Sequence, residues 1–435
     1  MRPAERDRLR KRSGTLLETL DNEATLYFAN VTLGTPAQNL RLDIDTGSSD
    51  LWTNSVTSGL CQEYPQDCAA SGTYDANKST TYSYVNSDFN IQYADGSAAQ
   101  GDYAMDTLGI GGALISDVQF GIGYNSSSAQ GILGVGYAAN EASIPITGKS
   151  YNNVPEVLVN AKVINTLAYS LWLNDLDANE GSILFGGVDS DKYQGTLATL
   201  PIIQEQGVYR EFIVALTSLT AAGQDVFNNS PIPVLLDSGS SLSYLPTSYA
   251  EAIFEVFSAE YDSAAGAAVV DCNLMNTADT VDFSFSGKTI SVSMSELVLI
   301  DEVRRGQAIC ILGISDAGDT TAVLGDTFLR SAYVVYDLGN NQISLAQTDF
   351  NSTSSNIQEI SSGNDGVPGA STIATAVATL AVASGGGARN PGIPTVTAIG
   401  SGSFGAPVAM PVGLPYGKLA AIAAAGVGAG FALIL

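Results

Sequence analysis

The chain has 435 residues, enough for two or three domain-sized cores, and carries 44 acidic against 18 basic residues for a formal net charge of −26. A surface this acidic repels phosphate backbones, which argues against nucleic acid as a partner. The chain has no histidine, which excludes Ser-His-Asp and Cys-His catalysis and every His-ligated metal site. Because repulsion between carboxylates fades as they protonate, the composition favours a protein adapted to acid, although acidic surfaces also serve solubility.

The first twelve residues differ from the rest in charge. They hold six of the basic residues and end in the run Arg10-Lys11-Arg12. Such a run shortly before a strand pattern is typical of a dibasic processing site, with a solvated basic tail as the alternative. We therefore predict that residues 1–12 are the remnant of a pro-segment. Residues 1–20 lack a continuous apolar stretch, so we identify no signal peptide in this chain.

The residues from Thr25 to about Gln347 have the pattern of an all-β protein. Short β-branched and aromatic runs alternate there with clusters of Gly, Asn, Asp and Ser. In chain order, strands are predicted for residues 24–33, 40–44, 103–110, 182–185, 290–294 and 332–336. Two segments have helical spacing instead: 154–164, with Pro155 in an early helical position, and 248–261, with Thr247 as the expected N-cap.

The chain contains one internal repeat. Residues 42–49 (LDIDTGSS) resemble residues 234–241 (VLLDSGSS), 192 positions later. Each copy is followed downstream by two apolar residues and a glycine, at 132–134 and at 323–325. Two copies this far apart indicate two similar lobes rather than a short-period solenoid. We therefore divide the body into an N-terminal lobe, residues 13–200, and a C-terminal lobe, residues 201–350.

Each copy of the repeat carries an aspartate, Asp45 or Asp237, in the motif Asp-(Thr/Ser)-Gly-Ser-Ser. One such motif is weak evidence, because Asp and Gly are common in turns, but two behind apolar runs predict an acid pair. Two carboxylates held close cannot both ionise cheaply, so they share a proton and titrate in two macroscopic steps. The ionised member can then act as general base to a water that attacks a carbonyl carbon, and the protonated member can donate to the carbonyl oxygen. No metal or cofactor is needed for this chemistry.

The residues that follow the two aspartates fit this arrangement. Glycine lets the two loops approach closely, the first hydroxyl can bond across to the opposite loop, and the second hydroxyl can donate to an outer carboxylate oxygen. The residues assigned to these three roles are Gly47 and Gly239, Thr46 and Ser238, and Ser48 and Ser240.

Four segments together resemble the pepsin family of aspartic endopeptidases: residues 45–52 (DTGSSDLW), 93–97 (YADGS), 237–241 (DSGSS) and 324–330 (LGDTFLR). The similarity runs from about Tyr27 to Ala346. Within the family, the chain is most similar to fungal secreted and wall-anchored members, the yapsins and candidapepsins. The resemblance implies an all-β, bilobal fold with a few short helices and an active-site cleft between the lobes. It also implies a monomer that cuts protein and peptide substrates at acidic pH.

The resemblance implies roles for residues outside the repeat. Tyr93 would be the tyrosine of a flap that closes over substrate, with Trp52 as its hydrogen-bonding partner, and Gly96 and Ser97 would bind the substrate backbone. Asp95 would face the residue on the acyl side of the scissile bond and favour basic residues there, alongside large apolar ones. A simple turn role is the alternative for Asp95, since Asp-Gly is common in hairpin turns.

The four cysteines lack a CxxC spacing and suit two disulfides in an oxidising compartment. They allow three pairings, of which the resemblance implies Cys61–Cys68 near the cleft and Cys272–Cys310 in the second lobe. N-glycosylation sequons stand at Asn30, Asn77, Asn125, Asn228 and Asn351. Cysteines and sequons together favour a secreted glycoprotein.

The composition changes after Asp349. Residues 351–418 are rich in Ser, Thr, Gly, Ala and Pro, and we predict a flexible stalk there. Residues 419–435 are wholly apolar or glycine and resemble the terminal signal for a glycosylphosphatidylinositol (GPI) anchor, with residues 400–403 (GSGS) as the candidate attachment site. A transmembrane helix is the alternative, although 17 residues rich in Ala and Gly are marginal for spanning about 30 Å. We expect a protein of the secretory pathway, anchored at the plasma membrane or cell wall.

Two other functions are alternatives to a peptidase. A catalytically silent peptide-binding protein would normally lack one aspartate or the flap tyrosine, and neither is missing here. A two-carboxylate glycoside hydrolase does not require the repeated motif, and the chain has only Trp52 and Trp172 to line a sugar cleft. Acidic assays on denatured globin and on a polysaccharide separate the three.

Overall fold

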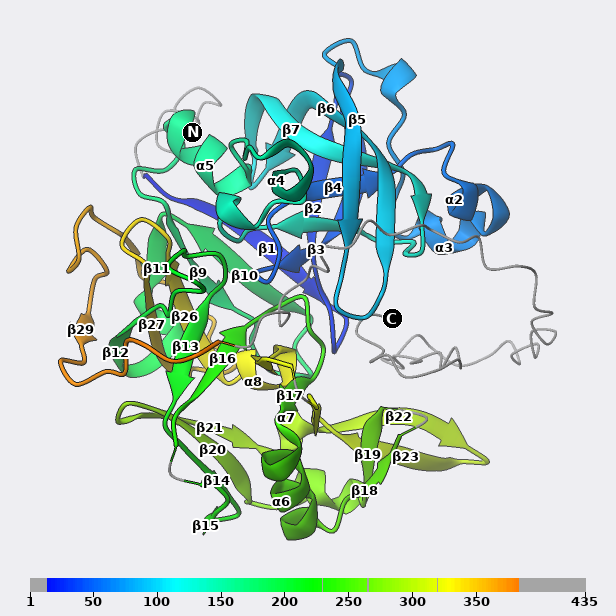
Figure 1. Ribbon diagram of the computed structural model, residues 1–435. Helices are drawn as coiled ribbons and strands as arrows, with labels where there is room; N and C mark the ends of the chain where they lie inside the picture. Colours follow the sequence, from blue (N-terminus) through cyan, green and yellow to red (C-terminus); the bar gives the residue numbers. More distant parts are fainter. Residues whose placement is uncertain (1–13, 229, 264–265, 319, 383–435) are drawn as a thin grey trace.

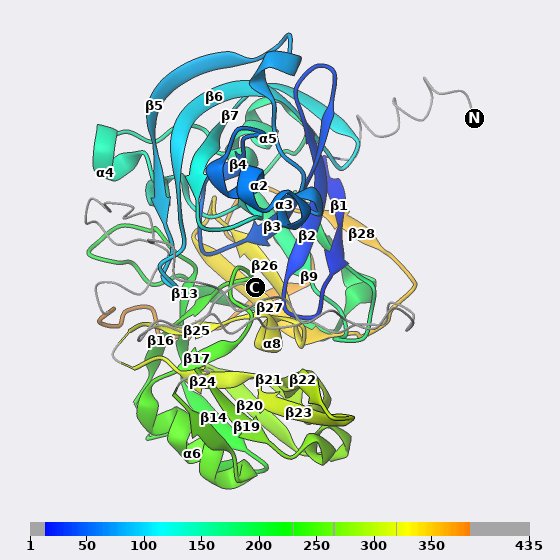
Figure 2. The ribbon, with the colours of Figure 1, turned by 90° about the vertical axis from the view of Figure 1, so that its right-hand side faces the viewer.

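The computed structural model of the chain describes residues 14–228, 230–263, 266–318 and 320–382 (Figure 1). The predicted pro-segment 1–12, the later part of the predicted stalk and the predicted anchor signal lie outside these residues. The described chain forms two lobes, one above the other in Figure 1 and again in Figure 2, where the molecule is turned by 90°. Strands dominate both lobes, which confirms the all-β, bilobal prediction.

The strands are β1 (Leu16–Asn22), β2 (Tyr27–Leu33), β3 (Gln38–Asp45), β4 (Leu51–Asn54), β5 (Ser83–Gln92), β6 (Ala98–Ile110), β7 (Ala113–Ser126), β8 (Gly131–Gly134), β9 (Ala168–Trp172), β10 (Glu180–Phe185), β11 (Gly187–Asp189), β12 (Tyr193–Pro201), β13 (Ile213–Leu216), β14 (Ser218–Ala221), β15 (Gln224–Asp225), β16 (Ile232–Leu236), β17 (Ser243–Leu245), β18 (Glu260–Asp262), β19 (Ala267–Val270), β20 (Thr280–Phe285), β21 (Lys288–Ser293), β22 (Val298–Arg304), β23 (Gln307–Leu312), β24 (Ile314–Asp316), β25 (Ala322–Leu324), β26 (Ala332–Asp337), β27 (Gln342–Thr348), β28 (Ile357–Glu359) and β29 (Ala370–Thr372). The α-helices are α2 (Gly59–Glu63), α3 (Pro65–Ala69), α4 (Ile144–Thr147), α5 (Val154–Asn160), α6 (Thr247–Phe257), α7 (Met294–Leu297) and α8 (Asp326–Leu329).

One sheet of fourteen strands runs through the N-terminal lobe and into the junction of the lobes, in the order β29-β12-β27-β26-β9-β10-β1-β2-β3-β8-β4-β7-β6-β5. The second lobe is built on a five-stranded sheet, β13-β16-β25-β17-β24, and two four-stranded sheets. Strands β26 and β27 come late in the chain but pair with β9 and β12. Two strands of the segment predicted as the C-terminal lobe, β26 and β27, therefore belong to the shared sheet.

The internal repeat is present in the topology as well as in the sequence. In the N-terminal lobe, β3 runs parallel to β8, and β8 pairs antiparallel with β4. In the C-terminal lobe, β16 runs parallel to β25, and β25 pairs antiparallel with β17. Each motif aspartate thus stands at the same place in its lobe, at the end of the first strand of the three.

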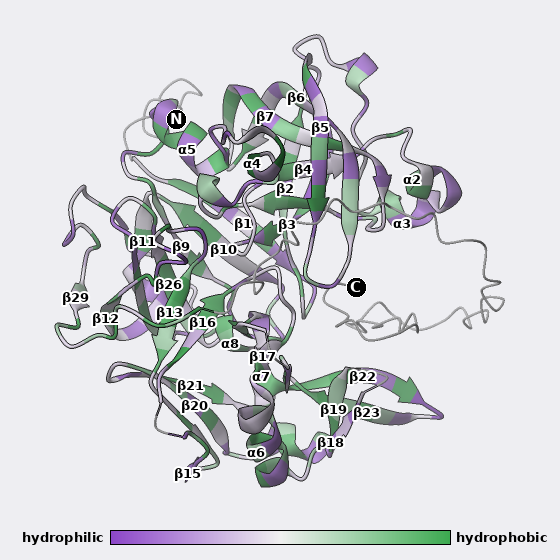
Figure 3. Ribbon diagram, in the orientation of Figure 1, coloured by the Kyte–Doolittle hydropathy of each residue, from purple (hydrophilic) through white to green (hydrophobic). Residues whose placement is uncertain are grey.

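Burial along the strands follows their positions in the sheets. Strand β1 alternates buried and exposed residues, as expected when one face is packed and the other is solvated. The last four residues of β3 and all of β8 are buried, because these strands are covered on both faces where the lobes meet. Figure 3 shows α6 with both hydrophilic and hydrophobic colours, in agreement with its buried face of Tyr249, Ala250, Ile253, Phe254 and Phe257.

Both predicted helices exist, with different ends. Helix α5 starts at Val154 with Pro155 in its first turn, and Asn153 caps it by accepting from the N–H of Glu156. It stops at Asn160 rather than 164, because Lys162 takes a left-handed conformation (φ 57°). The expected N-cap role of Thr247 is wrong: Thr247 is the first helical residue of α6, and its hydroxyl donates to Asp316 instead.

The predicted stalk is ordered over its first part, where the expectation of flexibility is wrong. Residues 351–382 lie along the body: β28 pairs antiparallel with β11, and β29 pairs parallel with β12. Ile360 and Val367 are buried in a small apolar cluster with Trp172, Tyr333 and other residues of the shared sheet. The folded body therefore extends to at least residue 382. Among the described residues, no helix has the length and apolarity needed to cross a membrane.

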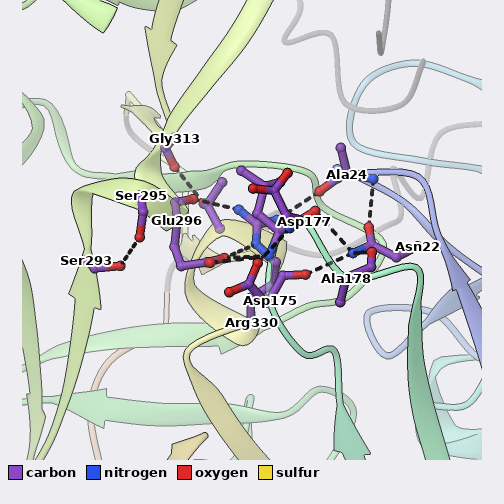
Figure 4. A network of polar contacts seen from close by, with 12 residues as sticks. Asn22, Ala24, Asp175, Asp177, Ala178, Ser293, Ser295, Glu296, Gly313 and Arg330 are labelled. Atoms are coloured by element: carbon purple, nitrogen blue, oxygen red, sulfur yellow. Dashed lines mark hydrogen bonds and ion pairs between the residues drawn. The ribbon is translucent and has the colours of Figure 1, made fainter. Parts of the chain in front are cut away.

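A buried ion pair joins the lobes (Figure 4). Arg330, fully buried after α8, donates from Nε to Glu296 Oε2 (2.6 Å) and from Nη2 to the Glu296 carbonyl (2.6 Å). Its third nitrogen, Nη1, donates to the carbonyl of Ala24 in the N-terminal lobe (2.9 Å). Glu296 also accepts from the N–H of Leu176 (3.2 Å). One guanidinium thus connects the β1–β2 turn to the second lobe.

Both disulfides predicted by resemblance are present. Cys61–Cys68 joins α2 to α3, and Cys272–Cys310 ties β23 to the turn that follows β19.

Candidate active site

Asp45 and Asp237 occupy equivalent positions in two loops that meet between the lobes. Asp45 Oδ1 accepts from the N–H of Gly47 (2.7 Å), and Oδ2 accepts from the Ser48 hydroxyl. Asp237 repeats this pattern: Oδ1 accepts from the N–H of Gly239 (2.9 Å), and Oδ2 accepts from the Ser240 hydroxyl (2.7 Å). The same two donors in each loop fix the orientation of each carboxyl group.

The two loops are locked together by reciprocal hydrogen bonds. The Thr46 hydroxyl donates to the carbonyl of Leu236 (2.9 Å) and accepts from the N–H of Ser238 (2.9 Å). The Ser238 hydroxyl donates to the carbonyl of Ile44 (2.6 Å) and accepts from the N–H of Thr46 (3.2 Å). Each hydroxyl therefore satisfies a donor and an acceptor of the other lobe, as the sequence indicated.

The two glycines of the motif show how close the carboxyl groups are. A Cβ atom on Gly47 would lie 2.5 Å from Asp237 Oδ1, and one on Gly239 would lie 2.5 Å from Asp45 Oδ1. Real Cβ atoms do not come this close to such atoms, so only glycine fits at either position. Each glycine thus faces the carboxyl group of the opposite lobe.

The electrostatics fit a proton held between the two groups. Burial raises the pKa of Asp45 to about 8, the negative charge of Asp237 adds to the rise, and the Ser48 hydroxyl opposes it. Both effects disfavour two carboxylates at once, so the pair holds one proton over the acidic range.

A hairpin of β5 and β6 carries the residues expected in a flap. The Trp52 indole N–H donates to the Tyr93 hydroxyl (2.8 Å), and both side chains are buried in a cluster with Phe89 and Tyr103. Burial raises the pKa of Tyr93 well above its usual value, and the negative charge of Asp45 contributes. The predicted Tyr93–Trp52 contact is therefore present, and the tyrosine lies within electrostatic reach of Asp45.

The tip of this hairpin is the turn from Tyr93 to Ser97. The N–H of Tyr93 donates to the Ser97 carbonyl (2.8 Å), and Gly96 has φ +86° with open space on its Cβ side. Asp95 accepts from both the N–H (2.8 Å) and the hydroxyl (2.7 Å) of Ser97, in each case on Oδ1. Asp95 thus has the turn role that the sequence left open, and its second oxygen takes no part in either bond.

A family model described as "Eukaryotic aspartyl protease" matches residues 26–348. The chain is a eukaryotic aspartyl protease. The match covers the loops of Asp45 and Asp237 and the β5–β6 hairpin, and it ends before the ordered extension 351–382.

This aspartyl protease has fungal relatives. It is 54% identical to the "Probable aspartic-type endopeptidase opsB" of Aspergillus oryzae, over 89% of this chain and 82% of that protein. It is 41% identical to the "Acid protease" of Saccharomycopsis fibuligera (76% and 83% covered) and to the "Secreted aspartic protease 1" of Candida albicans (77% and 84% covered). The crystal structure of the aspartic proteinase from Irpex lacteus has the same fold, with a TM-score of 0.66 at 22% identity over 79% of this chain and all of that one.

Three further acids are buried near the loops of Asp45 and Asp237 and were not predicted from the sequence: Asp43, Glu141 and Asp326. Burial raises the pKa of Glu141 to about 9, although it accepts from the N–H of Tyr151 (2.7 Å). Asp43 could have been noticed, because an aspartate inside the apolar run 42–44 is unusual and Leu235 stands at its place in the repeat. Asp326 carries a similar signal, because Val135 stands at its place in the other copy of the repeat, whereas the burial of Glu141 has no such signal in the sequence.

Proposed function

We propose that this aspartic-type endopeptidase uses Asp45 and Asp237 as its catalytic acids and works at acidic pH. The observation that carries the proposal is the reciprocal fit of the two loops, in which each motif glycine faces the opposite carboxyl group. In acid the pair keeps the single proton that the chemistry requires.

In this mechanism the ionised aspartate takes a proton from a water, which attacks the scissile carbonyl carbon. The protonated aspartate donates to the carbonyl oxygen, so a neutral gem-diol forms without a covalent enzyme intermediate. Collapse of the diol returns a proton to the leaving nitrogen and breaks the C–N bond. Ser48 and Ser240 hold the outer carboxyl oxygens, and Thr46 and Ser238 keep the two loops in register.

The hairpin of β5 and β6 acts as the flap in this proposal. Tyr93, braced by Trp52, covers the substrate, and the backbone at Gly96 and Ser97 binds an extended peptide. Open space beside Gly96 leaves room for a substrate chain at the tip. The substrates are proteins and peptides, and the enzyme acts as a monomer.

The test of this function is digestion of denatured globin at acidic pH by protein processed after Arg12, with a polysaccharide as the alternative substrate. A statine-type inhibitor should block digestion, because its hydroxyl mimics the tetrahedral intermediate, and a chelator should not. Peptide binding without cleavage would support a silent binding protein instead, and sugar release would support a glycoside hydrolase.

Asp95 gives the proposed specificity. Its carboxylate would offer a charge-assisted hydrogen bond to Lys or Arg on the acyl side, worth a preference of roughly tenfold to a hundredfold. Burial raises the pKa of Asp95, against the hydrogen bonds from Ser97, so the carboxylate is lost as pH falls through this raised value. We therefore expect cleavage after basic and large apolar residues, with the basic share fading in strong acid.

Peptide-library digestion with mass spectrometry measures this share. Asp95→Ala should lose most cleavage after Lys and Arg while keeping cleavage after Leu and Phe. Asp88→Ala, on β5 away from the flap tip, is the matched control and should leave both unchanged. An Asp95→Ala enzyme with the wild-type ratio would show that Asp95 serves only the turn.

The proposed location is the cell surface, after passage through the secretory pathway. Two disulfides and exposed sequon asparagines support an oxidising, glycosylating route, and a relative carries the name "Secreted aspartic protease 8". Anchoring through a glycolipid predicts that the apolar terminus is removed. Mass spectrometry of the mature protein should find no peptide from residues 431–435, and finding one would contradict the anchor.

A further inference from the structure

A second pair of carboxyl groups lies next to the catalytic aspartates. Asp43 stands on β3 two residues before Asp45, so both side chains leave the strand on the same face. Asp326 begins α8, and its N–H donates to the carbonyl of Ser240 in the second catalytic loop (2.8 Å). The exposed fractions of Asp43 and Asp326 are 1% and 0%.

None of the four carboxyl oxygens of Asp43 and Asp326 has a hydrogen bond of good geometry among the described residues, although the backbone N–H groups of Tyr27 and Ile44 lower the pKa of Asp43 against the larger effect of burial. A buried carboxylate without donors is far more costly than a buried carboxylic acid. Arg330, whose charge acts on Asp326, has its guanidinium bonded to Glu296 and Ala24 instead.

The catalytic pair and this second pair act on one another. Burial raises the pKa of Asp43 well above its usual range, and the charges of Asp45 and Asp237 raise it further. Burial does the same to Asp326, where Arg330 opposes the rise and the charges of Asp43, Asp237 and Asp45 add to it. Tyr27 and Tyr336 also face this pair, since the charge of Asp326 contributes to the raised pKa of each hydroxyl.

The fold itself does not need acids at these two positions. In the internal repeat, Asp43 corresponds to Leu235, and Asp326, after the glycine of the later motif, corresponds to Val135. Leu235 and Val135 are both buried in the main apolar core. Each acid therefore replaces an apolar residue that the equivalent site of the other lobe accommodates.

We propose that Asp43 and Asp326 form a pH-sensing acid pair, neutral while the enzyme works in acid, whose ionisation at higher pH loosens the junction of the two catalytic loops and sets the upper pH limit of the folded enzyme. A carboxyl group with a higher pKa in the folded than in the unfolded chain stabilises the fold fully below its unfolded pKa, at about 4. That contribution is lost as pH rises through the folded pKa. Stability is therefore greatest in acid and falls towards neutral and alkaline pH.

Thermal unfolding of the processed enzyme at about pH 4 and about pH 7.5 tests this pair. Asp43→Asn keeps the shape and removes one ionisation, so its midpoint should rise by a few degrees at the higher pH relative to wild type and change little in acid. At the higher pH, the half-life of the folded enzyme should lengthen on the order of tenfold for each unit by which the pKa of the replaced carboxyl group is higher in the folded than in the unfolded chain. Asp326→Asn should act in the same direction.

Asp106→Asn is the matched control. Asp106 is equally buried, but burial alone does not decide its pKa: hydroxyls of Ser79, Thr81 and Tyr74 hold it below its usual value. Its replacement should cost stability at both pH values. If Asp43→Asn and Asp326→Asn keep the wild-type difference between the two pH values, or lose stability equally at both, the proposal is wrong.

Asp43→Leu, which copies Leu235, gives the same comparison if the amide variant does not fold. Because the readout is unfolding rather than hydrolysis, the result is independent of the roles proposed for Asp45 and Asp237. A wild-type enzyme without acid peptidase activity would contradict those roles and leave this test unaffected.

Discussion

Asp45→Asn or Asp237→Asn is expected to abolish proteolysis while leaving the fold intact. An amide can neither serve as general base nor share a proton with the remaining carboxyl group, so kcat should fall roughly 10³-fold or more. The fold should persist, because the glycine N–H and serine hydroxyl that hold each carboxyl group can still donate to an amide oxygen. Asp45→Asn should even favour the folded state above acidic pH, because burial raises the pKa of Asp45 and the amide cannot ionise.

The measurement is single-turnover cleavage of a fluorogenic peptide at acidic pH, with thermal unfolding as the check on folding. Asp117→Asn is the control, since Asp117 is exposed on β7, where the pairing with β6 shifts register, and its φ of 58° is a conformation that asparagine tolerates well. Near-normal activity in either dyad variant would refute the assignment of the catalytic acids. Equal loss in both, with an unchanged unfolding midpoint, would support two acids that act as a unit.

Arg330→Ala is expected to destabilise the enzyme by roughly 3–5 kcal/mol, a large part of the 5–15 kcal/mol typical of folded proteins. The substitution leaves Glu296 buried without its partner and frees the carbonyls of Glu296 and Ala24. Because Ala24 belongs to the N-terminal lobe, the lobes should also separate more readily (Figure 4).

Urea unfolding at acidic pH measures this cost. Arg304→Ala, which removes an exposed pair with Glu302, is the matched control and should cost about 0–1 kcal/mol. The double variant Glu296→Leu/Arg330→Leu should be more stable than Arg330→Ala, since it leaves no unpaired charge behind. Similar unfolding of the Arg330 and Arg304 variants would mean that the buried pair does not hold the lobes together.

The geometry of the loops at Asp45 and Asp237 could be predicted because the residues that form it are neighbours in the sequence. The motif at Asp45 and at Asp237 carries its glycine, its hydroxyls and its apolar strand within eight residues, and the repeat implied that the two copies meet. The contacts of Thr46 and Ser238 followed from the same logic. The flap contact of Tyr93 with Trp52 came from resemblance, because 41 residues separate them and no local pattern links them.

Other features depend on contacts between distant parts of the chain. Residues 351–382 have the composition of a flexible stalk, yet Ile360 and Val367 suffice to hold them because the shared sheet offers an apolar face and an open edge at β12. The placement of β26 beside β9 could likewise not be predicted, since pairing between strands more than 150 residues apart leaves no periodic pattern in the sequence.

The sequence by itself determined the fold class, the duplicated acid motif and the residues that support it, because each is encoded by neighbours along the chain. Only the tertiary structure decided which acids are buried together. Asp43 and Asp326 are far apart in sequence, and their burial and their effect on one another arise only when β3 and α8 pack around the loops of Asp45 and Asp237. The pKa of a carboxyl group depends on this three-dimensional environment, and composition can give only the net charge.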